Sequence, residues 1–186
     1  MKTNLTRDTL YWSLARFGES FAYIAATEQG LSFVGSLDGS YEEMTSRLAN
    51  RYDIADLVRD DGKLHAYGTE LADYWTGART GFDSRFDLRG TPFQLRVWAA
   101  LLDIPYGETR SYSEIASAIG SPAAVRAVGS AIGANPVLIA VPCHRVVGKN
   151  GTLTGYRGGL AMKQKLLRLE QDAAFRETRH EYAGRL

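Results

Sequence analysis

Short runs of apolar residues predict strands in the first half of the chain. Two such runs, Phe21–Ala26 and Leu31–Val34, flank the turn-forming residues Thr27–Gly30, and this pattern predicts a β-hairpin. Farther along, the residues of 82–88 alternate between apolar or small side chains and charged ones, which predicts another strand with one buried face.

Apolar residues at helical spacing predict two helices between these strands. Ser40 is followed three residues later by Glu43, a pairing that caps helix N-termini, and apolar residues three or four apart come after it. A second helical face over 64–75 ends at Gly77, a residue type common just past a helix C-terminus. The first half is therefore expected to form an α/β domain.

Helical spacing dominates the second half. The run Thr91–Gln94 combines a capping threonine, a proline at the first helical position and a glutamine that can return the capping hydrogen bond. Two shorter helices are predicted over 113–119 and 123–134, separated by the tight turn Gly120–Pro122. Two short helices across such a turn indicate a helix-turn-helix.

Charge and turn residues divide the chain near its middle. Residues 1–90 contain 10 Lys and Arg against 14 Asp and Glu, whereas residues 91–186 contain 12 against 7. The Gly- and Pro-containing run Asp87–Pro92 lies at this change and predicts two domains, 1–88 and 89–186. The basic second half is a weak pointer toward a nucleic-acid partner.

Composition excludes several other classes of protein. With 186 residues, 45% hydrophobic and 23% charged, the chain is expected to be a soluble globular protein. Cys143 is the only cysteine, so no internal disulfide can form, and the three histidines lie too far apart in sequence for a zinc site of usual spacing. We therefore expect no metal and no cofactor. Because no signal peptide or membrane-spanning run is present, the expected location is the cytoplasm.

The second helix of the predicted pair is rich in small residues. Short side chains let a helix backbone approach another surface, either a neighbouring helix or a nucleic-acid groove. Arg126 lies among them and off the apolar stripe, where it could be solvated or contact DNA. The small positions considered for DNA contact are Ala124, Ala127, Gly129 and Ser130.

The run Pro142–Val146 contains the candidate chemistry. Most lone cysteines in soluble proteins are inert core residues, but Cys143 is followed by two potentially cationic side chains, His144 and Arg145. Nearby cations favour the thiolate, which is the nucleophilic form. On an extended segment adjacent side chains point to opposite sides, so His144 is expected to act through a water or a local kink and to need a third group that orients it.

These motifs resemble the C-terminal domain of the O6-alkylguanine-DNA alkyltransferases, also called methylated-DNA–protein-cysteine methyltransferases. The resemblance covers residues from about Thr91 to Glu170 and rests on the run Pro142–Val146, preceded by Asn135-Pro136 and followed by Gly155–Leu160. It implies a ribonuclease H-like α/β N-terminal domain and a mostly α C-terminal domain with a winged helix-turn-helix.

The resemblance also implies the roles of individual residues. Cys143 would accept the alkyl group, His144 would take its proton through a water, and Glu170 would orient His144. Asn135 would brace the turn before the active-site strand, and Tyr112 would hydrogen-bond the flipped guanine. Arg126 would fill the gap left in the duplex. The implied substrate pocket consists of Tyr156, the Arg157 backbone, Val146 and Ile132.

The resemblance implies a function with two rivals. The protein would be a monomer that binds double-stranded DNA containing O6-alkylguanine and would repair it once, irreversibly, by alkyl transfer to its own cysteine. A lesion-sensing DNA-binding protein that performs no repair is the first alternative, although relatives of that kind replace the reactive cysteine. A cysteine hydrolase built on Cys143 and His144 is the second, and it is disfavoured because hydrolases usually bring their histidine from a distant part of the chain.

Overall fold

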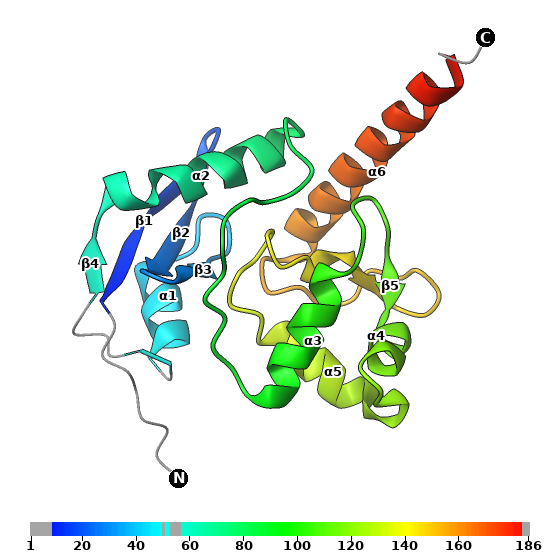
Figure 1. Ribbon diagram of the computed structural model, residues 1–186, viewed down its shortest axis with the longest axis horizontal. Helices are drawn as coiled ribbons and strands as arrows, with labels where there is room; N and C mark the ends of the chain where they lie inside the picture. Colours follow the sequence, from blue (N-terminus) through cyan, green and yellow to red (C-terminus); the bar gives the residue numbers. More distant parts are fainter. Residues whose placement is uncertain (1–8, 50, 53–56, 184–186) are drawn as a thin grey trace.

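The chain folds into a sheet-containing half and a helical half that lie side by side (Figure 1). The computed structural model describes residues 9–49, 51–52 and 57–183, with side chains up to residue 173. In this part of the chain, no helix has both the length and the apolar character needed to cross a membrane. The α/β first half and the largely helical second half agree with the sequence prediction at this level.

A four-stranded mixed sheet forms the first half. Its strands are β1 (Leu10–Phe17), β2 (Ser20–Thr27), β3 (Gly30–Val34) and β4 (Leu57–Arg59), in the order β3-β2-β1-β4. The β1–β2 and β2–β3 pairs are antiparallel, and β4 runs parallel to β1. The predicted hairpin is therefore confirmed as β2 and β3, whereas the sequence patterns did not predict β1 or β4.

Helices α1 (Tyr41–Leu48) and α2 (Asp61–Thr76) cover opposite faces of this sheet. Alternate residues of β2 separate the two faces: Ile24 packs in the same cluster as α2, whereas Ala25 packs with α1. Ser40 caps α1 by accepting from the Glu43 N–H at 3.1 Å, and Gly77 ends α2 with a φ of 78°. Both helices predicted for this half are confirmed.

The strand predicted over 82–88 is wrong. Only a single bridge joins Phe86 to Leu31, with the Leu31 N–H donating to the Arg85 carbonyl at 2.8 Å and the Asp87 N–H donating back at 3.0 Å. The Asp87 carboxylate then accepts from the Thr27 hydroxyl at 2.8 Å. The segment therefore docks on the sheet at one point and continues as the connection between the two halves, as Figure 1 shows.

The second half consists mainly of helices. Its elements are α3 (Pro92–Leu102), β5 (Arg110–Ser111), α4 (Tyr112–Ala118), a 3₁₀ helix at Pro122–Ala124, α5 (Val125–Gly133), a 3₁₀ helix at Cys143–Arg145, β6 (Val146–Val147) and α6 (Leu160–Ala183). Strands β5 and β6 pair in parallel. The predicted capping box of Thr91 and Gln94 is present. A second box, Ser111 with Glu114, starts α4 at Tyr112, one residue earlier than predicted.

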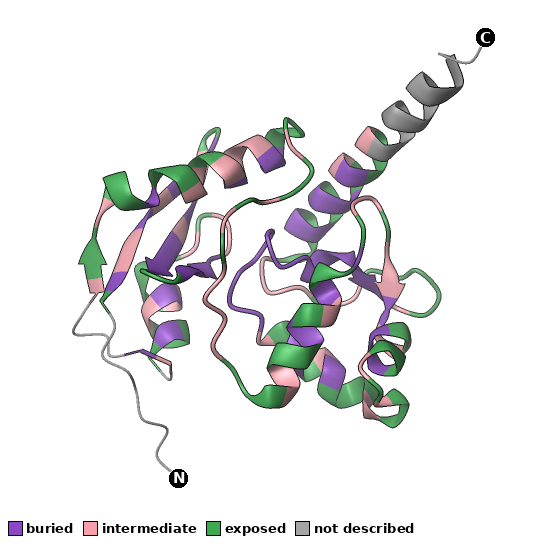
Figure 2. Cartoon of the chain, in the orientation of Figure 1, coloured by how far each residue is buried: buried purple, intermediate pink, exposed green. Residues whose placement is uncertain are grey.

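A single hydrophobic cluster extends through both halves. It joins the inner face of β1 and β2 and the buried side of α2 to α3, α5 and the segment 137–141. Trp98 of α3 is fully buried and donates its indole N–H to the Ala131 carbonyl of α5 at 2.9 Å. Figure 2 shows buried residues both in the sheet and in the helical half. The halves therefore share a core.

Candidate active site

A buried segment, residues 135–147, carries the candidate chemistry. All of its residues are buried, and in Figure 2 it appears as a continuous purple trace between the halves. It pairs with the outer edge of β3, because Val34 donates to the Pro136 carbonyl at 3.0 Å and Leu138 donates to the Val34 carbonyl at 3.3 Å. Ile139 adopts a φ of 68°, a strained value for a β-branched residue that persists only where surrounding contacts enforce it.

Cys143 lies in a 3₁₀ turn, not on the extended strand that the sequence suggested. Its N–H donates to the Val141 carbonyl at 2.8 Å, and the Arg145 N–H donates to the Pro142 carbonyl at 3.0 Å. The helical turn spans Cys143–Arg145, and with three residues per turn these consecutive side chains point in different directions. This turn is a local kink of the kind that the sequence interpretation gave as one of two alternatives for His144, the other being a bridging water.

Asn135 fixes the position of the thiol. Its side-chain amide donates to Cys143 Sγ at 3.0 Å and to the Val141 carbonyl at 2.9 Å, while its carbonyl oxygen accepts from the Val137 N–H at 3.0 Å. Asn135 is 1% exposed. One buried amide therefore ties the beginning of the segment to the sulfur near its end.

His144 and Glu170 form a buried pair. His144 Nε2 lies 2.5 Å from Glu170 Oε1, and both side chains are at most 1% exposed. The Glu170 carboxylate comes from α6 and also accepts from Arg145 Nε at 2.8 Å, from the Gly107 N–H at 3.1 Å and from the Tyr74 hydroxyl. His144 Nδ1 is buried and has no hydrogen-bond partner among the described protein atoms. With Nε2–H held by the carboxylate, Nδ1 is left as a proton acceptor.

Burial and local charge set the ionisation of these groups. Burial lowers the pKa of His144, against the opposing effect of Glu170, so the imidazole is neutral at rest. Burial acts to raise the pKa of Glu170, but hydrogen bonds to His144 and Arg145, the charge of Arg145 and, in acid, the charge of protonated His144 lower it to about 2. Burial raises the pKa of the Cys143 thiol, although the Asn135 hydrogen bond opposes this. The resting sulfur is thus protonated and needs a base.

The cations that act on Cys143 are not the ones expected from the sequence. The prediction relied on His144 and Arg145, but His144 is neutral and Arg145 is directed to Glu170 and to the Ile104 carbonyl, at 2.6 Å. The charges that favour the thiolate come from two residues outside the motif, Arg157 and Lys163. The correction follows from the 3₁₀ turn, which directs Arg145 toward Glu170.

Arg157 connects the sheet to the site. Its side chain is 6% exposed; Nη1 donates to Glu43 Oε1 of α1 at 2.8 Å, and Nη2 donates to the Val34 and Pro136 carbonyls at 2.9 and 3.1 Å. The same guanidinium therefore holds α1, β3 and the start of the buried segment. The sequence assigned only the backbone of Arg157 to the pocket.

Lys163 is a buried cation that the sequence interpretation missed. It is fully buried on α6, and its ammonium donates to the Val146 carbonyl at 2.6 Å and to the Thr154 carbonyl at 3.1 Å. Position 163 lies on the same helical stripe as Leu166, Leu167 and Glu170, all of them buried. A lysine on a buried stripe was the signal that could have revealed it.

The remaining pocket candidates lie near the segment or on α4. The Tyr112 hydroxyl is 2.9 Å from Thr154 Oγ1, and a Cβ placed on Gly129 would lie 3.8 Å from the Tyr112 ring. Tyr156 is half-buried, and its ring meets the His144 ring edge-on at a centroid distance of 6.4 Å. Val146 and Ile132 are buried side chains of the shared core.

The candidate DNA-contacting residues form a separate surface on α5 and on the 3₁₀ helix that precedes it. Arg126, Ala127 and Ser130 are exposed, whereas Ala124 and Gly129 are partly covered. Four of these five residues, all except Gly129, line a shallow hollow together with Ala123 and Val125. This surface is accessible from outside, whereas Cys143 is only 4% exposed.

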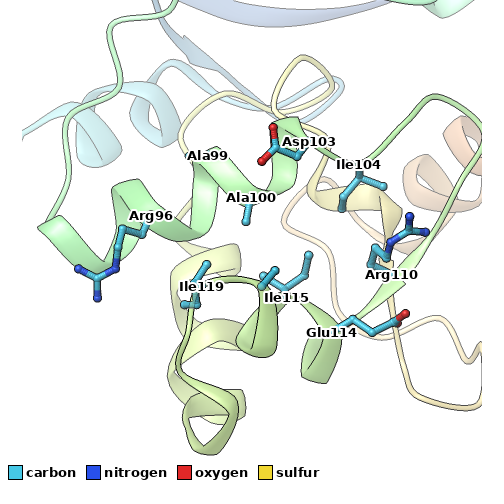
Figure 3. Close-up of a pocket in the computed structure, with 10 residues that line it drawn as sticks. Arg96, Ala99, Ala100, Asp103, Ile104, Arg110, Glu114, Ile115 and Ile119 are labelled. Carbon is cyan, nitrogen blue, oxygen red and sulfur yellow. The ribbon is translucent and has the colours of Figure 1, made fainter.

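A second hollow lies between α3 and α4 (Figure 3). It has a volume of about 540 Å³ and an apolar floor that includes Ile104, Ile115 and Ile119. Charged side chains surround this floor, among them Arg96, Asp103, Arg110 and Glu114, as Figure 3 shows. Two of its lining residues, Ile104 and Ile115, belong to the buried core cluster that also contains Cys143.

Comparison with protein families matches one domain model. Residues 92–172 match the model described as the DNA-binding domain of 6-O-methylguanine DNA methyltransferase. The matched range runs from the start of α3 into α6 and contains Asn135, Cys143, His144 and Glu170.

Whole-chain comparisons agree with this match. An inducible methylated-DNA–protein-cysteine methyltransferase of Bacillus subtilis is 55% identical over 174 residues, which cover 94% of this chain and 96% of the relative. A methylated-DNA–protein-cysteine methyltransferase of Mycobacterium bovis is 57% identical over 62% of this chain and 70% of its own. The crystal structure of Mycobacterium tuberculosis OGT in complex with DNA superimposes with a TM-score of 0.73 at 44% identity, covering 88% of this chain and 93% of that one.

Proposed function

The chain belongs to the family of methylated-DNA–protein-cysteine methyltransferases, and we propose that it repairs DNA by transferring the alkyl group of O6-alkylguanine to its own Cys143. The observation that carries the proposal is a pair of buried contacts at one 3₁₀ turn: Asn135 donates to Cys143 Sγ, and the next residue, a neutral His144, is held by Glu170. A lone buried thiol of the core would not need a neighbouring proton acceptor and an orienting carboxylate.

The reaction is a single displacement. His144 Nδ1 takes the Cys143 proton through a water, and the Asn135 amide donates to the sulfur as negative charge develops. The S–C bond forms while the C–O6 bond breaks, and its electron pair passes to the guanine oxygen. The guanine takes up a proton and leaves neutral. No residue is assigned to reverse the thioether, so each protein molecule reacts once.

The guanine pocket is proposed to lie between Tyr112, Tyr156 and the Arg157 backbone, with Val146 and Ile132 in its wall. Tyr112 would donate its hydroxyl proton toward the departing base, a role that requires it to exchange its present partner, Thr154, for the base. The edge-on contact of Tyr156 with His144 supports a place for Tyr156 next to the reacting groups.

DNA binding is assigned to the α4–α5 pair, used as a winged helix-turn-helix. The small residues Ala124, Ala127, Gly129 and Ser130, on α5 and the 3₁₀ helix before it, would allow a close approach to the duplex. Arg126 would enter the base stack in place of the extruded nucleotide. Extrusion costs a few kcal/mol, which is lower for a poorly paired damaged base. The burial of Cys143 supports a mechanism with a flipped base.

The two expected domains, 1–88 and 89–186, are retained in the proposal. The first would have a ribonuclease H-like topology and support the site, and the second would carry both DNA binding and alkyl transfer. A monomer suffices, because all of the groups assigned to the reaction lie on one chain. We further propose a cytoplasmic location, since a reducing compartment keeps the Cys143 thiol available.

Intact-mass measurement tests the function directly. The protein is mixed with a duplex oligonucleotide that contains one O6-methylguanine, and a gain of one CH₂ unit per protein, on Cys143, is expected. Cys143→Ala is the matched control and gains nothing. An unchanged mass together with tight binding to the lesion would instead identify a lesion sensor, and turnover of an ester or peptide would identify a hydrolase.

A further inference from the structure

One polar side chain of the first half reaches the buried His144–Glu170 pair. Tyr74 of α2 is 1% exposed, and its hydroxyl donates to Glu170 Oε1, the same oxygen that faces His144 Nε2. Its oxygen also accepts from Arg145 Nη2 at 3.0 Å. Of the hydrogen-bond partners that the described residues give Glu170, only Tyr74 comes from the first half.

Packing fixes the ring that presents this hydroxyl. The Tyr74 ring stacks on Phe82 at a centroid distance of 4.9 Å and meets Tyr106 edge-on at 5.7 Å. Phe82 lies in the connection after α2, and Tyr106 lies after α3. The hydroxyl is therefore held in place by both halves, and the contact with Glu170 does not depend on a freely rotating side chain.

We infer that Tyr74 is a positioning residue through which the first half holds the Glu170 carboxylate, and with it the His144 imidazole, in the orientation and ionisation that alkyl transfer requires. The inference rests on the proposed function, which it deepens. It gives the N-terminal half a part in the reaction beyond support of the fold.

The direction of the effect follows from competition for one carboxylate oxygen. A donor to Oε1 takes up part of the negative charge that would otherwise stabilise a protonated His144. Tyr74 thus keeps His144 neutral and able to accept the Cys143 proton. Burial and the nearby Glu170 charge raise the pKa of the Tyr74 hydroxyl, so it remains a donor throughout the working pH range.

Other groups also act on His144, and they stay constant in the comparison below. Charged and aromatic groups face His144 or the Glu170 carboxylate from several elements. They are Glu170 and Lys163 on α6, Arg145 on the same 3₁₀ turn, Tyr156 on the loop before α6 and Tyr74 on α2. Replacing Tyr74 by phenylalanine removes one hydroxyl and retains the ring that packs on Phe82 and Tyr106.

The test is an NMR titration of the His144 ring nitrogens in the full-length wild type and Tyr74→Phe. The expected result is a rise in the His144 pKa of about 0.5 to 1 pH unit in the variant. The acid limb of the single-turnover transfer rate is expected to move by the same amount, so the rate at a pH on that limb falls about 3- to 10-fold. The matched control is Tyr67→Phe, seven residues earlier on the same face of α2, because Tyr67 makes no hydrogen bond to Glu170 or His144 among those described. It is expected to leave the His144 pKa and the transfer rate unchanged.

Several outcomes would overturn the inference. An unchanged His144 titration in Tyr74→Phe would do so, as would an equal shift in Tyr67→Phe. In a Glu170→Gln background, Tyr74→Phe is expected to add no shift, and an additional shift would mean that Tyr74 does not act through the carboxylate.

A second measurement covers the case in which Tyr74→Phe does not fold. Protein labelled with ¹³Cζ-tyrosine is compared between wild type and Glu170→Gln, and an unchanged Tyr74 signal would overturn the contact. Both NMR readouts are independent of alkyl transfer. Failure of the wild type to gain the alkyl mass would instead overturn the proposed function.

Discussion

The ionised state of Glu170 links the chemistry of the site to the stability of the fold. Its pKa of about 2 lies below the ordinary value of 4.5, because His144 and Arg145 outweigh the effect of burial. A carboxylate with a lowered pKa stabilises the folded protein fully above about pH 4.5, and this stabilisation is lost as the pH falls toward 2. The shift corresponds to a contribution on the order of 3 kcal/mol.

We expect this contribution to appear in urea unfolding at pH 7, 4.5 and 3. The wild type should lose unfolding free energy between pH 4.5 and 3, and Glu170→Gln should be less stable at pH 7 but lose less over that interval. Burial also lowers the pKa of His144, which adds acid sensitivity of the same sign from about pH 6.5 downward. Parallel pH dependences in the two proteins would contradict the assignment.

Asn135 is the residue for which a single substitution should affect both folding and reaction. Asn135→Ala leaves the Val141 carbonyl and the Val137 N–H without their buried side-chain partner, at an expected cost of about 2–4 kcal/mol in the free energy of unfolding. It also removes the donor to Cys143 Sγ, so we expect transfer to slow by about tenfold or more. Urea unfolding and single-turnover kinetics measure the two effects.

A control for Asn135 is available on the surface. Asn150→Ala removes an amide from the exposed turn that follows β6, where its partner is Thr152. This variant should change the transfer rate little. A transfer rate for Asn135→Ala equal to that of Asn150→Ala would remove Asn135 from the site.

The sequence pointed to candidate residues with local signals and gave no sign of the contacts made across the fold. Cys143, His144 and Glu170 were found through a motif and a resemblance, and the structure brings the three together. Tyr74 was interpreted as one more position on a helical face, because Glu170, which its hydroxyl meets in the fold, lies 96 positions away in the sequence. No local pattern encodes such a contact.

At the scale of elements, the edge of β3 depends on a glycine at its start. Gly30 has a φ of 153°, and a Cβ at this position would lie 2.4 Å from the Arg85 carbonyl oxygen. Because that oxygen belongs to backbone, the docked connection would have to move. We expect Gly30→Ala to lower the free energy of unfolding by about 2 kcal/mol or more.

Gly18 provides the matched comparison for Gly30. It also has a positive φ, 69°, but a Cβ added at this position would meet no atom within 4 Å. Gly18→Ala should therefore show only the backbone strain, about 1 kcal/mol. Denaturation midpoints of the two variants measure the difference. Equal losses of unfolding free energy would show that the close approach of Arg85 to Gly30 does not add to the cost of the substitution.

Elements with their own capping residues could be predicted, and elements defined by distant partners could not. Ser40, Thr91 and Gly77 mark helix ends in the sequence and do so in the structure. Strand β1 lacks a clean alternation, because its residues contact both α1 and α2, and it was therefore missed. The segment 82–88 alternates like a strand, but Leu31 offers it only one bridge.

At the scale of the whole molecule, the proposed DNA surface and the proposed acceptor site are separate. Arg126 is exposed on α5, whereas Cys143 lies in the shared core. We therefore expect Arg126→Ala to slow repair of O6-methylguanine in a duplex by about tenfold or more, because no side chain would then fill the space that the extruded nucleotide leaves in the base stack. Reaction with the free alkylated base should change little.

Arg96→Ala on α3 is the control for general loss of positive charge, since Arg96 lines the other hollow. Single-turnover rates with duplex and free base distinguish the variants. Equal slowing of both reactions by Arg126→Ala would refute a role in filling the duplex.

Because the two halves share a core, we expect the second half alone to fold poorly. Residues 89–186 alone would lack Tyr74, the Glu43 partner of Arg157 and the β3 edge that pairs with Pro136 and Leu138. We expect this fragment to unfold without a cooperative transition, as followed by the fluorescence of Trp98, which is fully buried in the intact chain. A fragment that unfolds cooperatively and accepts an alkyl group would contradict this.

The outer edge of β3 has one more consequence. An uncovered strand edge offers N–H and C=O groups to any passing chain and is a common origin of aggregation. Here Arg85 and Asp87 pair with Leu31 near the start of the edge, and Pro136 and Leu138 pair with Val34 at its end. The contacts that shape the acceptor segment therefore also protect the molecule from sticking to its own copies, and a protein whose halves have come apart should precipitate rather than persist as an inactive monomer.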